Sequence, residues 1–160
     1  AVLKQFLLDK GFQQPPYTTS QEFMDALAKG TDPKWKGLLD DFFWKITLFD
    51  NRITDATAKK LPNGQYEVTM KVHVGKIYVD GTGKETEATP DIPIDIGVFA
   101  ASTGAGKDGV PLYLEKRMVP KGDSTITVTV DGKPFDAGID PYNELIDRVS
   151  SDNRRPVTVQ

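Results

Sequence analysis

The first 45 residues of the chain repeat apolar positions at helical spacing. Residues 3–10 carry apolar side chains at i, i+3 and i+4 up to Gly11, which predicts a first helix. Thr19 and Glu22 are spaced as in a capping box, in which a hydroxyl and a carboxylate each accept a backbone N–H at a helix start. A second helix is therefore predicted from this box to about Lys29.

A third helix is predicted to begin at Asp32-Pro33 and to run through Trp44, because Asp caps helices and Pro suits the first helical position. Its apolar side combines Leu38 and Leu39 with aromatic residues. Such a stripe is usually part of a core or an interface, although it can also line a ligand groove. We expect the aromatic members to form an interdomain interface: Trp35, Phe42, Phe43 and Trp44.

From Ile46 to about residue 137 the pattern changes to alternation of apolar and polar residues, which predicts antiparallel strands with one buried face. Asn63-Gly64 is a strong hairpin signal. A change of apolar phase predicts a bulge near Gly75. Four inward rows require two packed layers: Tyr66, Val68, Met70, Val72 and Val74; Ile92, Ile94, Ile96 and Val98; Leu112 and Leu114; and Ile126, Val128 and Val130.

The end of the chain changes character again. Asp140-Pro141 predicts the start of a short helix over Tyr142–Arg148, and residues 150–155 look like a polar tail. The predicted fold is mainly β (α+β): a helical subdomain of about three helices over residues 1–45, an antiparallel β-sandwich of about seven strands over 46–138, and a short helix with a polar tail over 139–160.

Composition narrows the possible functions. The hydrophobic content of 38% and charged content of 27% are typical of a globular protein, and no apolar stretch is long enough to cross a bilayer, so we expect no direct membrane insertion. A net charge of −3 with scattered basic residues argues against nucleic acid as a partner. The absence of cysteine removes thiolate catalysis. The chain starts at Ala1 without an initiator Met, and we expect it to be a piece of a longer protein.

Candidate chemical groups each have a simpler interpretation. His73 is the only histidine, too few for a hydrolytic zinc site, and it belongs to the polar face of its strand. Residues 104–109 match G-x-G-x-x-G, but a strand-like segment follows in place of a helix, so a hairpin loop is favoured. Residues 80–87 are acidic and fit a solvated turn better than a calcium loop. Asp91 and Asp95 share one outward strand face as a possible acid–base pair, although no pocket is evident around them.

Several segments together resemble a known family. The most distinctive is Gly138-Ile139-Asp140-Pro141-Tyr142-Asn143-Glu144-Leu145-Ile146-Asp147-Arg148, followed by Asp152-Asn153. The match continues upstream through residues 15–20, 46–51, 61–69, 94–99 and 111–116. Across essentially its whole length, the chain resembles the C-terminal region of bacterial aminopeptidase N-like (gluzincin) zinc metallopeptidases of the type fused to an ABC-2 transporter permease.

This resemblance implies a non-catalytic role for the chain. The H-E-x-x-H zinc helix and the other catalytic residues of the family lie upstream of the matching region, so no catalytic or metal-ligating residue is carried onto this sequence, and zinc is expected only in the catalytic domain of the parent protein. The motif residues Gly138, Asp140, Pro141, Tyr142, Asp147 and Arg148 are expected to be structural. The resemblance also implies a soluble segment of a bacterial inner-membrane protein, with the extracytoplasmic side favoured.

Two main functional hypotheses follow. The first is a structural and interdomain module whose partner is the upstream catalytic domain of the same polypeptide. The second is a free-standing β-sandwich that binds peptide or carbohydrate through loops such as residues 101–110. An independent hydrolase that uses Asp91 and Asp95 is a third, weaker alternative.

Overall fold

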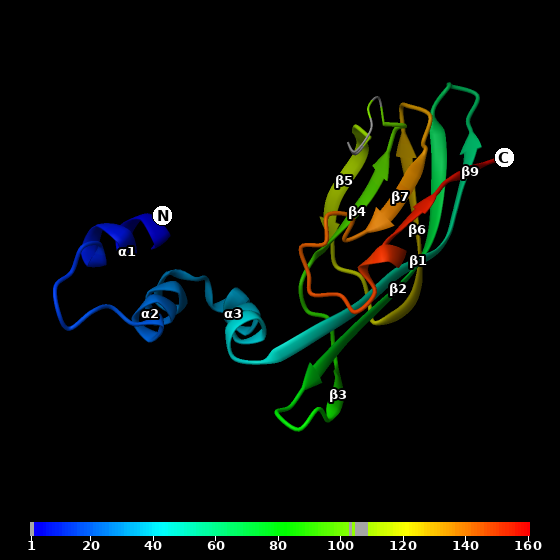
Figure 1. Cartoon of the computed structure of the whole chain (residues 1–160). Coiled ribbons are helices and arrows are strands. Elements are labelled where there is room, and N and C mark those ends of the chain that lie inside the picture. The colour runs from blue at the N-terminus through cyan, green and yellow to red at the C-terminus, as the bar shows by residue number, and fades with distance from the viewer. Residues whose placement is uncertain (1, 103, 105–108) are drawn as a thin grey trace. The chain divides into compact units, whose positions relative to one another are not determined.

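The protein consists of two compact units. The computed structural model of the chain describes residues 2–102, 104 and 109–160. Residue contacts divide the chain into Ala1–Lys45, which is helical, and Ile46–Gln160, which is built of strands (Figure 1). The described residues are 22% helical and 42% strand, so the fold is mainly β with a sandwich-like pair of sheets, as the sequence predicted.

The helical unit begins with two helices that pack through aromatic side chains. Helix α1 spans Val2–Lys10 and helix α2 spans Ser20–Gly30. The rings of Phe6 and Phe23 meet edge to face, with centroids 5.1 Å apart. The predicted capping box is confirmed: the Thr19 hydroxyl accepts the backbone N–H of Glu22, and the Glu22 carboxylate accepts that of Thr19.

The third predicted helix begins as a single 3₁₀ turn, η1, at Pro33–Trp35, and continues as helix α3 over Lys36–Phe43. The Asp32 side chain accepts the backbone N–H of Lys34, so this residue caps the turn as the sequence indicated.

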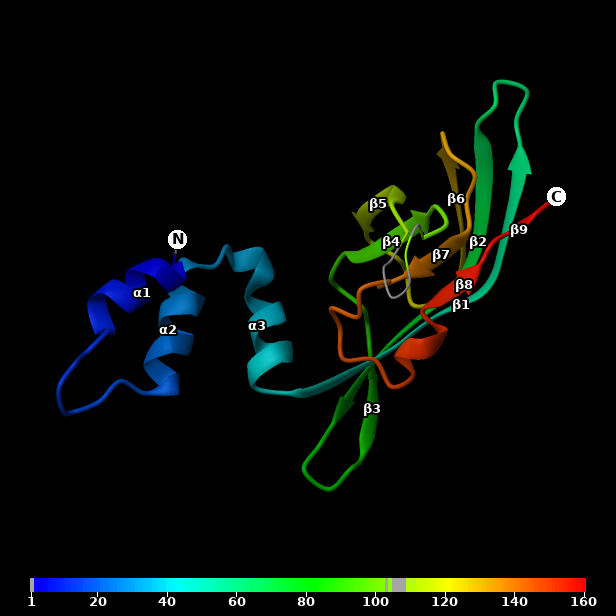
Figure 2. The same cartoon turned by 45° about the horizontal axis from the view of Figure 1, so that its top comes forward.

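The β unit contains a larger sheet in which the longest strands form a hairpin. Strands β1 (Ile46–Lys60) and β2 (Tyr66–Val79) pair antiparallel around the predicted turn at Asn63-Gly64. The other strands are β3 (Glu85–Ala88), β6 (Gly122–Val130) and β9 (Thr158–Val159). The order is β3-β2-β1-β9, and β6 pairs with the first part of β2. Figure 2 shows the β3 end of the hairpin extending beyond the second sheet.

The second sheet has the order β5-β4-β7-β8. Its strands are β4 (Ile94–Phe99), β5 (Pro111–Arg117), β7 (Asp136–Ile139) and β8 (Arg154–Pro156). Between the sheets lie the apolar rows that the alternation predicted, with Val68, Met70, Ile96, Val98 and Ile139 at or near zero exposure. Burial of such rows is the dominant favourable contribution to folding. The row from β5 is less complete, because Leu114 is 39% exposed.

The predicted position of the bulge is wrong. The bulge is not near Gly75, since β2 stays in register with β1 there, and the irregularity falls between Ile53 and Asp55 on β1. The buried alternation of β2 continues through this point, so Ile77 and Val79 lie on the opposite face from Val72 and Val74. Here the inward position is occupied by the buried Lys76.

The C-terminal prediction also needs correction. No helix forms over residues 142–148; they form an irregular loop with an isolated bridge between Asp147 and Phe49, and a single 3₁₀ turn, η2, follows at Ser150–Asp152. The backbones of Asp140 (φ 45°) and Asn143 (φ 53°) are left-handed, which a right-handed helix cannot accommodate. The expected polar tail instead supplies β8 to one sheet and β9 to the other.

Candidate functional site

The aromatic stripe of the helical unit is exposed. Trp35, Phe42, Phe43 and Trp44 keep 36%, 45%, 49% and 58% of their surface accessible. The buried residue of α3 is Asp41, which forms an ion pair with Lys45 at 3.8 Å. Large exposed apolar patches on soluble proteins mark interaction sites or grooves. The exposed aromatic stripe is consistent with the predicted interdomain interface.

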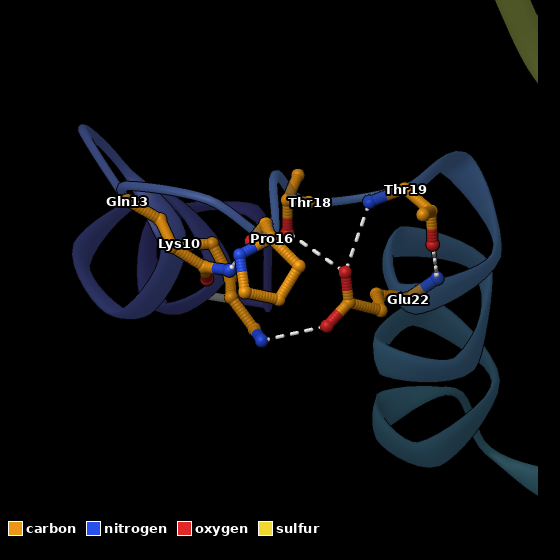
Figure 3. Close-up of polar contacts among 6 residues, drawn as sticks. All are labelled: Lys10, Gln13, Pro16, Thr18, Thr19 and Glu22. Carbon is orange, nitrogen blue, oxygen red and sulfur yellow. Dashed lines mark hydrogen bonds and ion pairs between the residues drawn. The ribbon is translucent and has the colours of Figure 1, made fainter.

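Glu22 joins the start of α2 to the end of α1. One carboxylate oxygen accepts a hydrogen bond from Lys10 Nζ at 2.7 Å, and the other accepts from the Thr19 amide and the Thr18 hydroxyl at 2.9 and 3.1 Å (Figure 3). The Lys10 hydrogen bond, followed by those from Thr19 and Thr18, lowers the pKa of Glu22 to about 2. This network is exposed, so it organises the connection between the helices and provides no enclosed reaction site.

The motif near the C-terminus forms an ordered loop in which Asp140 binds backbone amides. Its two carboxylate oxygens accept the amides of Glu144 and Leu145 at 2.9 and 3.1 Å. Burial raises the pKa of Asp140, against these amides, which lower it. Asp140 itself is only 1% exposed. The Asp140 carboxylate therefore stabilises the conformation of the loop.

Asp147 attaches the same loop to the larger sheet. One oxygen accepts the amide of Asn51 at 2.7 Å and the other accepts the amide of Val149 at 2.9 Å. Backbone bonds from Phe49 to Ile146 and from Arg148 to Phe49 continue the attachment. Burial raises the pKa of Asp147, and the amides of Asn51 and Val149 oppose that effect.

Tyr142 attaches the loop to the second sheet, where Phe99 also contacts Arg154 of β8. The Tyr142 ring contacts the Phe99 ring edge to face at 5.9 Å, and the Arg154 guanidinium lies 4.4 Å from the Phe99 ring centroid. Glycine is required at Gly138, where a Cβ would lie 2.7 Å from the backbone oxygen of Asn153 and 3.3 Å from a Pro141 carbon. Arg148 reaches the β3 hairpin and pairs with Glu85. The structure therefore places Gly138 in β7 and the other motif residues in the loop that follows this strand.

The two aspartates considered as an acid–base pair bind different lysines. Asp91 precedes β4 and pairs with Lys76 Nζ at 2.6 Å, whereas Asp95 lies within β4 and pairs with Lys116 Nζ at 2.7 Å. Asp91 lies outside β4 and Asp95 is only 9% exposed, so the prediction of a carboxylate pair on one exposed strand face is wrong. The alternation correctly separates Asp95 from the core residues Ile94 and Ile96, but it could not indicate that both faces of β4 are buried.

Two of the remaining sequence candidates, His73 and the acidic turn at residues 80–87, have local structural partners. His73 lies opposite Asp123 on β6, with Nδ1 2.6 Å from the carboxylate. The Asp80 carboxylate accepts from Thr82 and Lys84 and closes a turn. The glycine-rich segment 104–109 and the loop 101–110 fall largely outside the described residues.

Sequence reasoning missed three buried polar residues. The Lys76 side chain is fully buried, lies 5.4 Å from the Tyr78 ring centroid and pairs with Asp91. Asn51 and Asn153 are also fully buried. The alternation of inward and outward positions along β1 and β2 could have predicted that Asn51 and Lys76 are buried, because both occupy inward positions. Asn153 belongs to the irregular C-terminal segment and carries no such signal.

Comparisons with protein-family models, with curated proteins and with solved structures found no match for this chain. Within the described part of the chain, no helix is long and apolar enough to span a membrane.

Proposed function

We propose that this chain is the non-catalytic C-terminal module of a membrane-linked zinc aminopeptidase, and that it packs against and orients the catalytic domain of the same polypeptide. The observation that carries the proposal is the exposed aromatic stripe, Trp35, Phe42, Phe43 and Trp44. Four large rings left accessible on a small helical unit provide the apolar core that an interdomain contact requires.

The carboxylates of the C-terminal motif support a structural role. Asp140 and Asp147 use both of their oxygens to bind backbone amides, and Arg148 contacts Glu85. A general acid or base needs an oxygen within reach of a substrate proton. These carboxylates are already occupied by the loop that they hold, so the motif serves best as a clamp that keeps the sandwich and its C-terminal segment together.

The test uses the natural full-length gene product. We expect an H-E-x-x-H sequence upstream of Ala1, zinc bound there, and peptidase activity in the intact protein. Replacing Phe42 and Phe43 with Ser should reduce that activity and expose the junction to limited proteolysis. The matched control is Phe135→Ser in the β unit, because Phe135 is 57% exposed but does not belong to the stripe. Equal behaviour of control and stripe variants, or stoichiometric zinc bound by this chain alone, would contradict the proposal.

A further inference from the structure

Strand β6 is a long sheet edge with one free side. It spans Gly122–Val130 and pairs antiparallel with β2 over its whole length without a register shift. In the described part of the chain, β2 is its only paired strand. In a regular antiparallel strand, alternate residues direct their N–H and C=O groups away from the existing partner. A row of backbone donors and acceptors is therefore available along the outer side of β6.

The composition of β6 does not protect this edge from pairing with another strand. Proteins usually block edge strands with charges, Pro or bulges, or by keeping them short. Strand β5, the long edge of the other sheet, carries Glu115, Lys116 and Arg117, whereas β8 and β9 have only three and two residues. Within β6 the single charge is Asp123, at the second position, and from Thr125 onward the strand alternates threonine with buried Ile126, Val128 and Val130.

The sequence around β6 is complementary to itself in one antiparallel register. When Ile126 lies on a two-fold axis, opposite Ile126 of a second copy, Thr125 faces Thr127 of that copy and Asp123 faces Thr129. Lys121 then lies opposite Asp131 at each end, so opposite charges meet twice and no like charges oppose each other. Thr127 already pairs with Thr69 of β2, at 3.4 Å between the hydroxyl oxygens. Cross-strand Thr pairs and opposite-charge pairs both stabilise sheets.

We propose that β6 is a self-association edge, through which two copies of this chain join antiparallel about Ile126 into one continuous sheet. A two-fold interface of this kind uses the same patch on both subunits and closes on itself. Lys121 and Asp131 are exposed, and they contact Glu87 and Gln65 within the chain, at 2.7 Å in each case. Each side chain can keep this contact while it also pairs with the second copy. Main-chain hydrogen bonds supply the affinity in such strand addition, and the side-chain pairs set the register.

The test introduces charges at Thr125 and Thr127, the two exposed positions on either side of the two-fold axis at Ile126. In T125E/T127E, the carboxylate introduced at position 125 faces the one introduced at position 127 of the second copy, while within the chain position 125 remains next to Lys71. In T125E/T127K, the facing charges are opposite at the same two positions, so this variant is the matched control. Both sites are exposed, so circular dichroism and the urea midpoint should show that both variants fold.

Sedimentation analysis of the full chain up to millimolar concentration should detect a dimer. The T125E/T127E variant should weaken dimerisation by about tenfold or more, because two like-charge pairs are created by symmetry. Added salt should restore part of that loss, and T125E/T127K should dimerise at least as well as the unmodified chain. A monomer at every concentration, or a dimer that responds equally to both variants, would overturn the proposal.

Discussion

The carboxylate of Asp147 accepts the backbone amide of Asn51 at 2.7 Å, although 96 residues separate them in the chain. This bond fixes the C-terminal loop to strand β1, whose Asn51 is completely buried. A buried amide that loses its only acceptor keeps the full cost of its desolvation, about 1–3 kcal/mol. The stability of the β unit should therefore depend on a residue that looks like part of a polar surface segment.

Asp147→Ala should lower the free energy of unfolding by about 2 kcal/mol, because the amides of Asn51 and Val149 both lose their acceptor. Asp147→Asn should lower it less, since one oxygen remains to accept one amide. Urea denaturation measures both losses. Asp131→Ala is a suitable control, because the Asp131 carboxylate accepts a hydrogen bond from the exposed side chain of Gln65. A loss for Asp131→Ala as large as that for Asp147→Ala would contradict the role assigned to the loop.

The pKa values of the loop carboxylates Asp140 and Asp147 should be shifted upward, whereas the pKa of the turn carboxylate Asp80 should be shifted downward. Burial raises the folded pKa of Asp140 and Asp147 above the ordinary 3.8, whereas hydrogen bonds from Thr82 and Lys84 lower that of Asp80. A raised folded pKa means that the native state holds its proton to higher pH than the unfolded state. The stability contributed by Asp140 and Asp147 is then greatest below pH 3.8 and declines as pH rises through the folded pKa.

Carbon-detected NMR titration of the carboxyl groups checks this directly. The midpoints of Asp140 and Asp147 should lie above 3.8, and that of Asp80 should lie below it. Midpoints for the two loop residues at or below 3.8 would mean that the amide bonds outweigh burial, and the predicted sign of their pH dependence would reverse.

The helices and the sandwich rows were predictable because their determinants are local. The Thr19–Glu22 box and the alternation from Val68 to Val74 each act within a few residues. The C-terminal loop was not predictable in this way, because Asp140 and Asp147 find their partners through tertiary structure and the left-handed Asn143 ends any helix. The aromatic spacing of the helical unit indicated a contact surface, but spacing alone carries no information about the partner.

Acidification should weaken the connection between α1 and α2. The pKa of Glu22 is lowered to about 2, so its contribution to stability is complete above the ordinary value of 4.5 and is lost as pH falls through 2. Glu22→Gln should imitate the acid state at neutral pH, because Gln cannot form the ion pair with Lys10. Helical circular dichroism and amide exchange of residues 19–23 measure the effect. Asp25→Asn on the same helix is the control, and an equal effect of both substitutions would refute the assignment.

Gly138 should tolerate no side chain, although its φ lies outside the left-handed region. A Cβ there would lie 2.7 Å from the backbone oxygen of Asn153 and 2.9 Å from Cγ of Arg154, and backbone cannot move aside as a flexible side chain can. Gly138→Ala should therefore lower the free energy of unfolding by about 1–3 kcal/mol, as overpacking does in other cores. Gly81→Ala should change it by less than about 0.5 kcal/mol, because nothing lies within 4 Å of that site. Equal urea midpoints for the two variants would show that β7 and the segment after η2 can separate without cost.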